Sequence, residues 1–231
     1  MEKNILPDPA DIEKLLDSLL SGSKPQSGRA REFFDEFRLR MLYYRCAMKE
    51  IETKIEVLDE EFSLRFDRNP IASVSCRLKE AKSIFDKMRR KNFPLSLESM
   101  EENIDDIAGI RVICPFLEDV YDLERALLEQ DDISLIERKD YIKEPKSNGY
   151  RSLHLVISVP IFLSGGKRII KVEVQIRTIA MDSWASLEHQ LRYKKDYCFT
   201  KHAEGELKLC ADLSAELDGR MEMLRRSIIG D

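Results

Sequence analysis

The sequence lacks the short motifs that mark the commonest nucleotide-binding and hydrolytic folds. It contains neither the G-x-x-x-x-G-K-[ST] loop of P-loop proteins nor the G-x-G-x-x-G turn of Rossmann domains. It also has no G-x-S-x-G elbow, so nothing supports a Ser-His-Asp hydrolase. If the protein handles phosphates, its side chains must bind them without a glycine-rich loop.

Long apolar runs and paired cysteines are missing as well. No segment approaches the roughly 18 consecutive apolar residues of a membrane helix, and the N-terminus has no apolar signal core. The five cysteines are far apart, without a C-x-x-C or a histidine at metal-ligand spacing, which favours buried free thiols over disulfides or zinc. These absences predict a cytoplasmic protein with no membrane partner.

An excess of basic residues is also absent. The 231 residues carry a net charge of −5, so RNA binding is possible through a local patch but is not indicated by the whole chain. This length can bury a sizeable core in one large domain or two small ones.

Helical patterns dominate both ends of the chain. Residues 11–20 predict a short amphipathic helix, and an apolar seam at heptad spacing predicts a long helix through residues 34–62. That seam packs either on the protein's own core or at a subunit interface; we expect mainly the first, with room for part of it to be shared between subunits. Apolar residues spaced by three and four between Leu209 and Ile228 predict a C-terminal helix suited to docking or oligomerisation.

The middle of the chain alternates strand and helix patterns, which predicts an α+β domain. Period-two alternation predicts a hairpin of residues 153–159 and 171–177, joined through Gly165 and Gly166. The expected organisation is N-terminal helices at 1–70, a core at 71–195 and a C-terminal helix at 196–231.

One face of the hairpin is polar. It carries His154, Glu173, Gln175 and Arg177. Such a face is either the solvated side of an antiparallel sheet or a binding surface. Tyr150 follows the Ser147-Asn148-Gly149 turn at the entrance of the hairpin, where its ring could stack on a nucleobase.

A second helix is expected over residues 77–91, which include seven basic residues. At 100° per residue, the arc opposite its apolar face carries Lys79, Lys82, Ser83, Lys87 and Arg90. This arc is either a solvated face or a cradle for a polyphosphate, with a nucleic-acid backbone as the competing ligand.

Two separated carboxylates complete the candidate chemistry. Asp105 and Asp106 precede a β-branched strand in which Gly109 allows a close backbone approach, and this acidic pair either caps a turn or binds Mg²⁺. Asp106 and Glu173, surrounded by lysine and arginine, are the groups that phosphoryl transfer needs.

Four motifs in order resemble the RelA/SpoT synthetase domain, and most nearly its single-domain small alarmone synthetases of the RelQ type. They are R-L-K-E-A-K-S-I-F-D-K-M, D-D-I-A-G-I-R-V-I, Y-I-K-E-P-K-S-N-G-Y-R-S-L-H and V-E-V-Q-I-R-T-x-A-M-D-S-W-A-S-L-E-H, within residues 77–193. The resemblance implies a nucleotidyltransferase-like mixed β-sheet and a GTP/GDP pyrophosphokinase. That enzyme moves the β,γ-pyrophosphate of ATP to the ribose 3′-OH of GDP or GTP, giving ppGpp or pppGpp and AMP.

The resemblance also implies a role for each matching residue. Arg77 and Arg111 would flank the adenine, and Tyr150 would stack on the guanine. The ATP phosphates would be held by Lys79, Lys82, Ser83, Lys87 and Arg90. Asp106 would hold Mg²⁺, and Glu173 would contribute to the metal or act as general base on the 3′-OH. The acceptor would also contact Lys146, Asn148 and His154, with Gln175, Arg177 and Glu188 as supporting or acceptor-side positions.

The chain departs from its longer relatives in three ways. It has no His-Asp hydrolase motif, and it ends at Asp231 without their regulatory domains, so we expect synthesis without hydrolysis. Glu137 stands where many relatives have arginine, which leaves the preference among GDP, GTP and GMP open.

RelQ-type relatives are tetramers, so a homo-oligomer is expected. The alternatives are a nucleotidyltransferase, or an idle nucleotide- or RNA-binding regulator, which would gain nothing from carboxylates beside phosphates.

Overall fold

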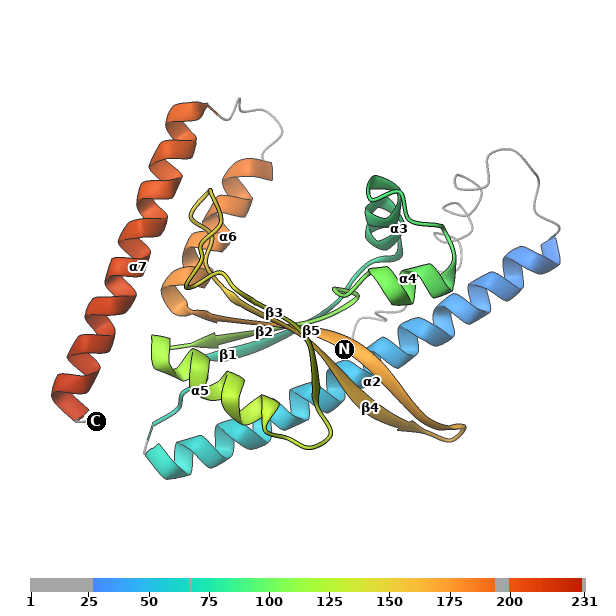
Figure 1. Ribbon diagram of the computed structural model, residues 1–231, viewed down its shortest axis with the longest axis horizontal. Coiled ribbons are helices and arrows are strands. Elements are labelled where there is room, and N and C mark those ends of the chain that lie inside the picture. Colours follow the sequence, from blue (N-terminus) through green and yellow to red (C-terminus); the bar gives the residue numbers. More distant parts are fainter. Residues whose placement is uncertain (1–26, 67, 194–199, 230–231) are drawn as a thin grey trace, which may run out of the picture. The chain divides into compact units, whose positions relative to one another are not determined.

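The computed structural model describes residues 27–66, 68–193 and 200–229 (Figure 1). The helix expected over residues 11–20 lies outside these residues. In chain order the elements are α2 (Ser27–Phe66), β1 (Ser73–Leu78), α3 (Ala81–Arg90), α4 (Leu97–Asn103), β2 (Ala108–Cys114), α5 (Leu117–Leu128), β3 (Ser134–Asp140), β4 (Leu153–Leu163), β5 (Gly166–Thr178), α6 (Ile179–Tyr193) and α7 (Lys201–Ile229).

The five strands form one mixed sheet in the order β1-β2-β5-β4-β3, which confirms the predicted α+β class. Strands β4 and β5 are the predicted hairpin, and their inward-facing residues are fully buried. Leu153, Leu155 and Ile157 on β4 and Val172, Val174 and Ile176 on β5 all have 0% exposure. Alternation of buried and half-exposed residues along β5 is the period-two pattern of a strand with one covered face.

The chain divides into two compact units whose boundaries fall inside α2 and four of the strands. Unit 1 comprises residues 1–51, 76–109 and 158–173, and unit 2 comprises 52–75, 110–157 and 174–231. Each unit has its own buried core and its own set of polar side chains. The division at residues 70 and 195 stays a prediction.

The core of unit 1 joins the first half of α2 to α3. Phe37 of α2 and Phe85 of α3 are 0% and 1% exposed, and their ring centroids lie 5.6 Å apart. The seam predicted for α2 is buried from Phe37 onwards, in both units, so it packs on the protein's own core as expected. Helix α4 was not predicted; Ser96 caps it by accepting a hydrogen bond from Ser99 N at 3.1 Å.

The basic helix of unit 1 begins later than the sequence pattern indicates. It starts at Ala81 rather than near Arg77, because Arg77 and Leu78 belong to β1. The amide of Lys79 donates to Ile107 O at 2.8 Å, so strand pairing outweighs helix propensity here. Lys79 is therefore not on the helix. A Cβ on Gly109 would lie 3.5 Å from Arg77 O, an ordinary contact, so the expected close approach does not require glycine.

The core of unit 2 packs α5 and the second half of α2 against its part of the sheet. Ile55 of α2 and Leu127 of α5 are both 0% exposed. Arg68 makes a two-pronged ion pair with the buried carboxylate of Asp119, with N–O distances of 2.9 and 2.5 Å. This pair fixes the segment after α2 on α5.

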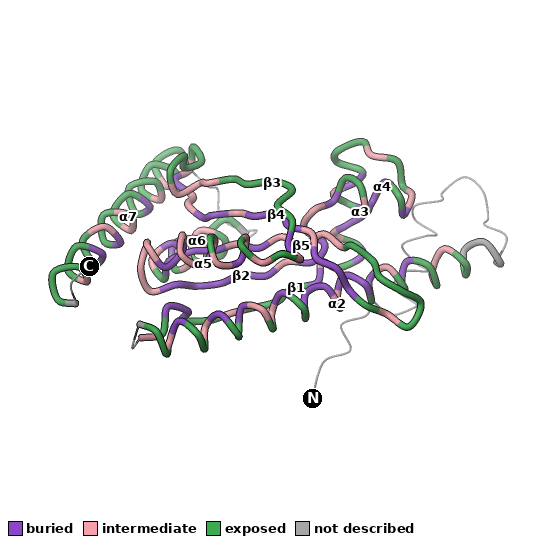
Figure 2. Tube along the Cα trace, turned by 60° about the horizontal axis from the view of Figure 1, so that its bottom comes forward, coloured by how far each residue is buried: buried purple, intermediate pink, exposed green. Residues whose placement is uncertain are grey.

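Helices α6 and α7 of unit 2 lie side by side (Figure 1). The indole Nε1 of Trp184 donates to Leu207 O at 2.8 Å, and the hydroxyl of Thr178 donates to the buried carboxylate of Asp218 at 2.7 Å. Much of the rest of α7 is exposed (Figure 2). Its exposed large apolar residues, 44–79% accessible, are Leu209, Leu213, Leu217, Met221, Met223, Leu224 and Ile228.

The thiols differ in exposure. Cys114 is buried and Cys46 half-buried, whereas Cys76 and Cys210 are exposed, so the expectation of buried thiols is wrong for the last two. All four are free. Within residues 27–66, 68–193 and 200–229, no helix combines the length and apolar character that a bilayer span requires.

Candidate functional site

A carboxylate held by two lysines is the first candidate, and it lies entirely in unit 1. Asp106 precedes β2; its Oδ1 accepts from Lys87 Nζ of α3, and its Oδ2 accepts from Lys79 Nζ after β1, each at 2.9 Å. We call these three residues the Asp106 cluster. Two of its members were predicted to lie on one helical arc. The fold instead delivers the lysines from different elements to one carboxylate.

The electrostatics of the Asp106 cluster keep its carboxylate ionised. Burial by itself raises the pKa of Asp106, but hydrogen bonds from Lys87 and Lys79, together with their positive charges, lower it below the ordinary value. With two ammonium groups and one carboxylate, the cluster carries a net positive charge. Such a group can attract phosphates while it offers carboxylate oxygen to a hard cation.

The remaining predicted ATP residues of unit 1 flank this cluster on β1 and α3. Lys82 and Arg90 are exposed on α3, Ser83 is half-buried there, and Arg77 is exposed on β1. The apolar face of α3 is buried through Ile84 and Met88, which directs Lys82 and Arg90 to the surface. These side chains are placed where a soluble polyanion can reach them.

The neighbouring acid has a different environment. Asp105 accepts from Lys171 Nζ of β5 at 2.6 Å, and the same ammonium donates to Glu102 O at 2.9 Å. Asp105 thus ties the end of α4 to β5 and does not join the Asp106 cluster. Glu173, the second predicted carboxylate, is half-buried on β5.

An aromatic cluster is the second candidate, and it lies entirely in unit 2. Tyr150 Oη and His154 Nε2 are 2.9 Å apart, and Lys146 Nζ lies 4.9 Å from the Tyr150 ring and 4.6 Å from the Tyr141 ring. Tyr141 also meets His154 edge to face, with centroids 5.3 Å apart. We call these four residues the tyrosine cluster. Its member Tyr141 was not predicted, although it begins the motif that contains the others.

The loop that carries Tyr150 is a tight turn. Gly149 N donates to Lys146 O at 2.8 Å, and Asn148 Oδ1 accepts from Tyr150 N at 3.2 Å. Gly149 has φ +91°, which an L-residue rarely adopts. Gly149 therefore supplies the positive φ of the turn, and the Asn148 side chain closes it by accepting from the backbone two residues on.

Arg177 holds the tyrosine from below the surface. It is 4% exposed, and its guanidinium donates to Tyr150 Oη at 2.6 Å, Gln175 Oε1 at 2.9 Å and Asp182 Oδ1 at 3.1 Å. A fourth contact, 3.3 Å long, reaches Ser152 Oγ. A guanidinium so buried, with four side-chain oxygens as acceptors, constrains the position of the Tyr150 hydroxyl.

Asp182 links the predicted Arg111 to this group. Arg111 Nη1 lies 3.4 Å from Asp182 Oδ1, the same oxygen that accepts from Arg177. The Nε of Arg111 is buried and has no hydrogen-bond partner within the described parts of the chain. Asp182 was missed from the sequence, because nothing in a helix pattern indicates which acid will meet a strand arginine.

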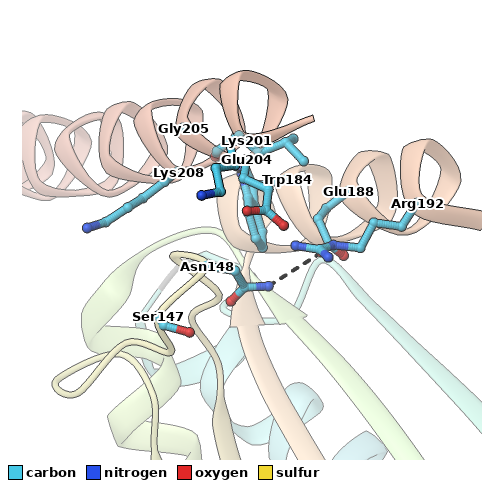
Figure 3. A pocket seen from close by; sticks show the side chains of 10 residues that line it. Ser147, Asn148, Trp184, Glu188, Arg192, Lys201, Glu204, Gly205 and Lys208 are labelled. Atoms are coloured by element: carbon cyan, nitrogen blue, oxygen red, sulfur yellow. Dashed lines mark hydrogen bonds and ion pairs between the residues drawn. The ribbon is translucent and has the colours of Figure 1, made fainter. Parts of the chain in front are cut away.

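A pocket of about 500 Å³ adjoins the Tyr150 loop, between that loop, α6 and the start of α7 (Figure 3). Asn148 Nδ2 donates to Glu188 Oε1 at 3.4 Å across it, and Arg192 pairs with Glu188. Trp184 forms part of its wall. The structure thus brings the predicted Asn148 and Glu188 together. A volume of this size suits a nucleobase or a nucleoside.

Glu137, the departure from the expected arginine, is exposed on β3. Its carboxylate pairs with Lys139 Nζ at 2.5 Å. The next residue, Arg138, instead binds Glu124 and Asp140, and these acids raise its pKa. The negative charge of Glu137 is therefore balanced by Lys139 on the same strand.

The sequence and structure match one family. A family model described as the region found in RelA / SpoT proteins matches residues 76–197. GTP pyrophosphokinase YwaC of Bacillus subtilis (strain 168) is 39% identical over 194 residues, which cover 84% of this chain and 92% of that protein. GTP pyrophosphokinase YjbM of the same organism is 35% identical over 186 residues, covering 80% and 86%.

A solved structure agrees with these sequence matches. It is the crystal structure of small alarmone synthetase 1 from Bacillus subtilis bound to its product pppGpp. It matches with a TM-score of 0.76 at 33% identity, covering 84% of this chain and 98% of that one.

Proposed function

We propose how this chain, which belongs to the RelA/SpoT family and is a GTP pyrophosphokinase of the small alarmone synthetase type, binds its two substrates. Each of its two clusters binds one of them. The reaction moves the β,γ-pyrophosphate of ATP to the ribose 3′-OH of GDP or GTP. The Asp106 cluster is assigned to ATP and the tyrosine cluster to the guanine nucleotide. The lysine-held carboxylate of Asp106 is the observation that carries this assignment.

The chemistry defines what the residues have to do. The acceptor's 3′ oxygen forms a bond to the β-phosphorus of ATP, and the bond from that phosphorus to the oxygen shared with the α-phosphate breaks. AMP leaves with that oxygen, and the 3′-OH loses its proton. Catalysis of such a transfer rests on positioning and on compensating the charge of the phosphoryl oxygens.

Lys79 and Lys87 supply compensating charge on the ATP side. They already stand within hydrogen-bond distance of Asp106, so their ammonium groups are fixed before a nucleotide arrives. Lys82, Ser83 and Arg90 on α3 add further phosphate donors, and Arg77 and Arg111 are assigned to the adenine. Arginine stacks on planar rings, which suits that role.

Asp106 and Glu173 are the proposed Mg²⁺ ligands. Among the described residues, no group of three or more His, Cys, Asp or Glu side chains could hold a metal by itself. Mg²⁺ is usually bound by one or two carboxylates together with substrate phosphates, and the ionised Asp106 fits that pattern. When bound, Mg²⁺ neutralises charge on the transferring phosphates. Glu173 is also the candidate base for the 3′-OH proton.

The tyrosine cluster is assigned to the acceptor. Tyr150 offers a ring for stacking on guanine, with its hydroxyl fixed by Arg177 and His154. Lys146 is exposed beside this ring and can reach a phosphate. Asn148 and Glu188 present amide and carboxylate groups that can pair with the edge of a base.

The test is incubation of the purified protein with ATP, Mg²⁺ and GDP, GTP or GMP, followed by separation of the nucleotides by anion exchange. A more highly charged guanine nucleotide should form with an equal amount of AMP. Pyrophosphate release instead of AMP would indicate nucleotidyl transfer, and no turnover with any acceptor would indicate an idle binder. The same assay on Glu137→Arg measures how that position sets acceptor preference.

The carboxylates are tested with a matched control. Asp106→Asn and Glu173→Gln should each lower kcat by at least about a hundredfold, since each loses a charge required for metal binding or proton transfer. Asp105→Asn removes an adjacent carboxylate that binds Lys171 outside the cluster, and it should keep near-normal turnover. Near-normal activity in Asp106→Asn or Glu173→Gln would remove that residue from the mechanism.

Assembly into a homo-oligomer, with a tetramer as the expected form, is proposed as well. The apolar stripe of α7 is exposed in the single chain, and a stripe of this length favours burial against another protein surface; its residues are Leu209, Leu213, Leu217, Met221, Leu224 and Ile228. ATP and guanine nucleotides are abundant in the cytoplasm, which supports that location for the enzyme.

A further inference from the structure

The loop that carries Tyr150 is in contact with the C-terminal helix. Gly149 is buried, and a Cβ built on it would lie 2.5 Å from the Cβ of Ala211 on α7 and 3.7 Å from Lys208 Cα. Its φ of +91° and this contact together require glycine. The residue that immediately precedes Tyr150 therefore rests directly on α7.

The residue that follows Tyr150 is attached to the same helix. Arg151 Nη1 donates to Gly149 O at 3.2 Å and to Ala211 O at 3.1 Å, and Nη2 donates to Asp212 Oδ1 at 3.1 Å. One guanidinium thus joins the loop backbone to the α7 backbone and to an α7 side chain. Its side chain is only 17% exposed.

From this arrangement we propose that Arg151 is a positioning residue that fixes the acceptor-binding loop on α7, which makes the C-terminal helix a working part of the acceptor site. Tyr150 is then held at three points. Arg177 fixes its hydroxyl from the sheet side, while Gly149 and Arg151 fix its backbone on either side. The inference rests on the proposed role of Tyr150 in binding the guanine nucleotide.

Arg151 acts on the loop rather than on the attachment of α7 as a whole. The helix has other anchors in unit 2. The Trp184 indole binds Leu207 O, Asp218 accepts from Thr178, and Glu222 accepts from the amide of Glu118. Loss of Arg151 should therefore leave α7 docked while the loop gains freedom. The donors of Arg151 are also directed at protein oxygens, which argues against direct contact with a nucleotide.

The experiment compares Arg151→Ala with Asp218→Ala in the full chain. Both remove one attachment of α7, but Arg151 hydrogen-bonds to the loop, whereas Asp218 accepts from Thr178 and interacts with Arg151 only through its charge. For Arg151→Ala we expect the KM for GDP or GTP to rise at least about tenfold, the size expected for charged hydrogen bonds. The KM for ATP and the kcat at saturating acceptor should stay within about twofold. Both variants should lower Tm by a few degrees, because each loses one contact between α7 and the rest of unit 2. Asp218→Ala should leave the acceptor KM unchanged.

Hydrogen exchange without nucleotide provides a readout that does not depend on catalysis. Amides of residues 146–152 should exchange faster in Arg151→Ala than in wild type and in Asp218→Ala. Gly149→Ala, which forces the loop away from Ala211, should raise the acceptor KM in the same direction. Arg151→Lys keeps the charge but not the planar fork, and it should recover only part of the loss.

The outcomes separate the inference from the proposed function. Unchanged loop exchange in Arg151→Ala, equal increases in the KM for both nucleotides, or the same acceptor defect in Asp218→Ala would each overturn the role of Arg151. Tyr150→Ala tests the premise. If its acceptor KM is unchanged while loop exchange still responds to Arg151→Ala, the attachment to α7 is correct and the assignment of Tyr150 to the acceptor is wrong.

Discussion

At the scale of single residues, neighbours of the same chemical type have different roles because their partners differ. Asp105 pairs with Lys171 of a strand, whereas Asp106 accepts from two lysines that belong to the candidate phosphate site. Arg177 is buried and bonded to four side chains, whereas Arg111 is half-exposed with an unpartnered Nε within the described residues. Residue type alone therefore does not tell a residue that binds a substrate or metal from one that only holds its neighbours in place.

The hydroxyl and the ring of Tyr150 should contribute to different properties. Tyr150→Phe keeps the stacking surface but leaves the buried Arg177 without one acceptor, so it should lower the free energy of unfolding by about 1–3 kcal/mol. Its acceptor KM should rise less than that of Tyr150→Ala, which should weaken acceptor binding by about 1–3 kcal/mol through lost stacking. Urea unfolding and steady-state kinetics of both variants measure the two effects. Equal acceptor KM values for the two variants would contradict the stacking role.

The ionisation of Asp106 predicts a pH dependence of stability. Its folded pKa lies below the ordinary value of 3.8, so the folded state binds fewer protons than the unfolded state near that pH. The stabilisation is complete above about pH 5 and is lost as the pH falls through the folded pKa. The difference in unfolding free energy between wild type and Asp106→Asn, measured by urea unfolding, should therefore shrink from pH 6 towards pH 3. A difference that stays constant over this range would show that Asp106 titrates normally.

At the scale of elements, pairing between strands and side-chain caps decided the boundaries. Helix α3 begins at Ala81 because Lys79 N pairs with Ile107 O. Helix α4 has seven residues, too few for a helical period to stand out, and its start depends on one serine. That helix precedes the Asp105–Lys171 pair, so it supports the segment that leads to Asp106.

The cap of α4 should be measurable. Ser96→Ala removes the oxygen that accepts from Ser99 N, and it should lower the free energy of unfolding by about 0.5–2 kcal/mol. Ser134→Ala, at an exposed strand position of β3, is the control and should stay within about 0.5 kcal/mol of wild type. Chemical denaturation of both variants makes the comparison, and equal stability of the two would mean that the cap contributes nothing.

At the scale of the whole molecule, α7 has two different faces. One carries the contacts to Arg151, Thr178 and Trp184 of unit 2. The other presents the exposed stripe from Leu209 to Ile228. If the stripe is a subunit interface, as proposed, the helix that holds the acceptor loop is also the helix that assembly covers.

Assembly is testable by introducing charge into the stripe. Wild type should sediment as an oligomer at micromolar concentration, and Leu213→Glu, at a position 56% exposed, should dissociate it because a buried carboxylate would be unpaired. Leu64→Glu, at a position of α2 that is 87% exposed, is the control on a different helix and should leave the mass unchanged. A monomeric wild type, or an oligomer unaffected by Leu213→Glu, would contradict the proposed interface.

The sequence by itself determined the features that depend on near neighbours in the chain. Period-two and heptad spacings gave the β4–β5 hairpin and the long α2, Asn148-Gly149 gave the turn before Tyr150, and the motifs from Arg77 to Tyr193 indicated the family. These features are local because spacing of two, three or four residues fixes which side chains share a face.

Only the tertiary structure decided which distant residues meet. It gave the adjacent Asp105 and Asp106 different lysine partners and buried Arg177 beneath Tyr150. It also brought Asp182 to Arg111 and attached Arg151 to Ala211, sixty residues away. Local spacing carries no information on such pairs, because their distance depends on the path of the whole chain between them. A buried charge such as that of Arg177 then pairs with the polar groups that the fold places beside it, because leaving the charge unpaired would cost several kcal/mol.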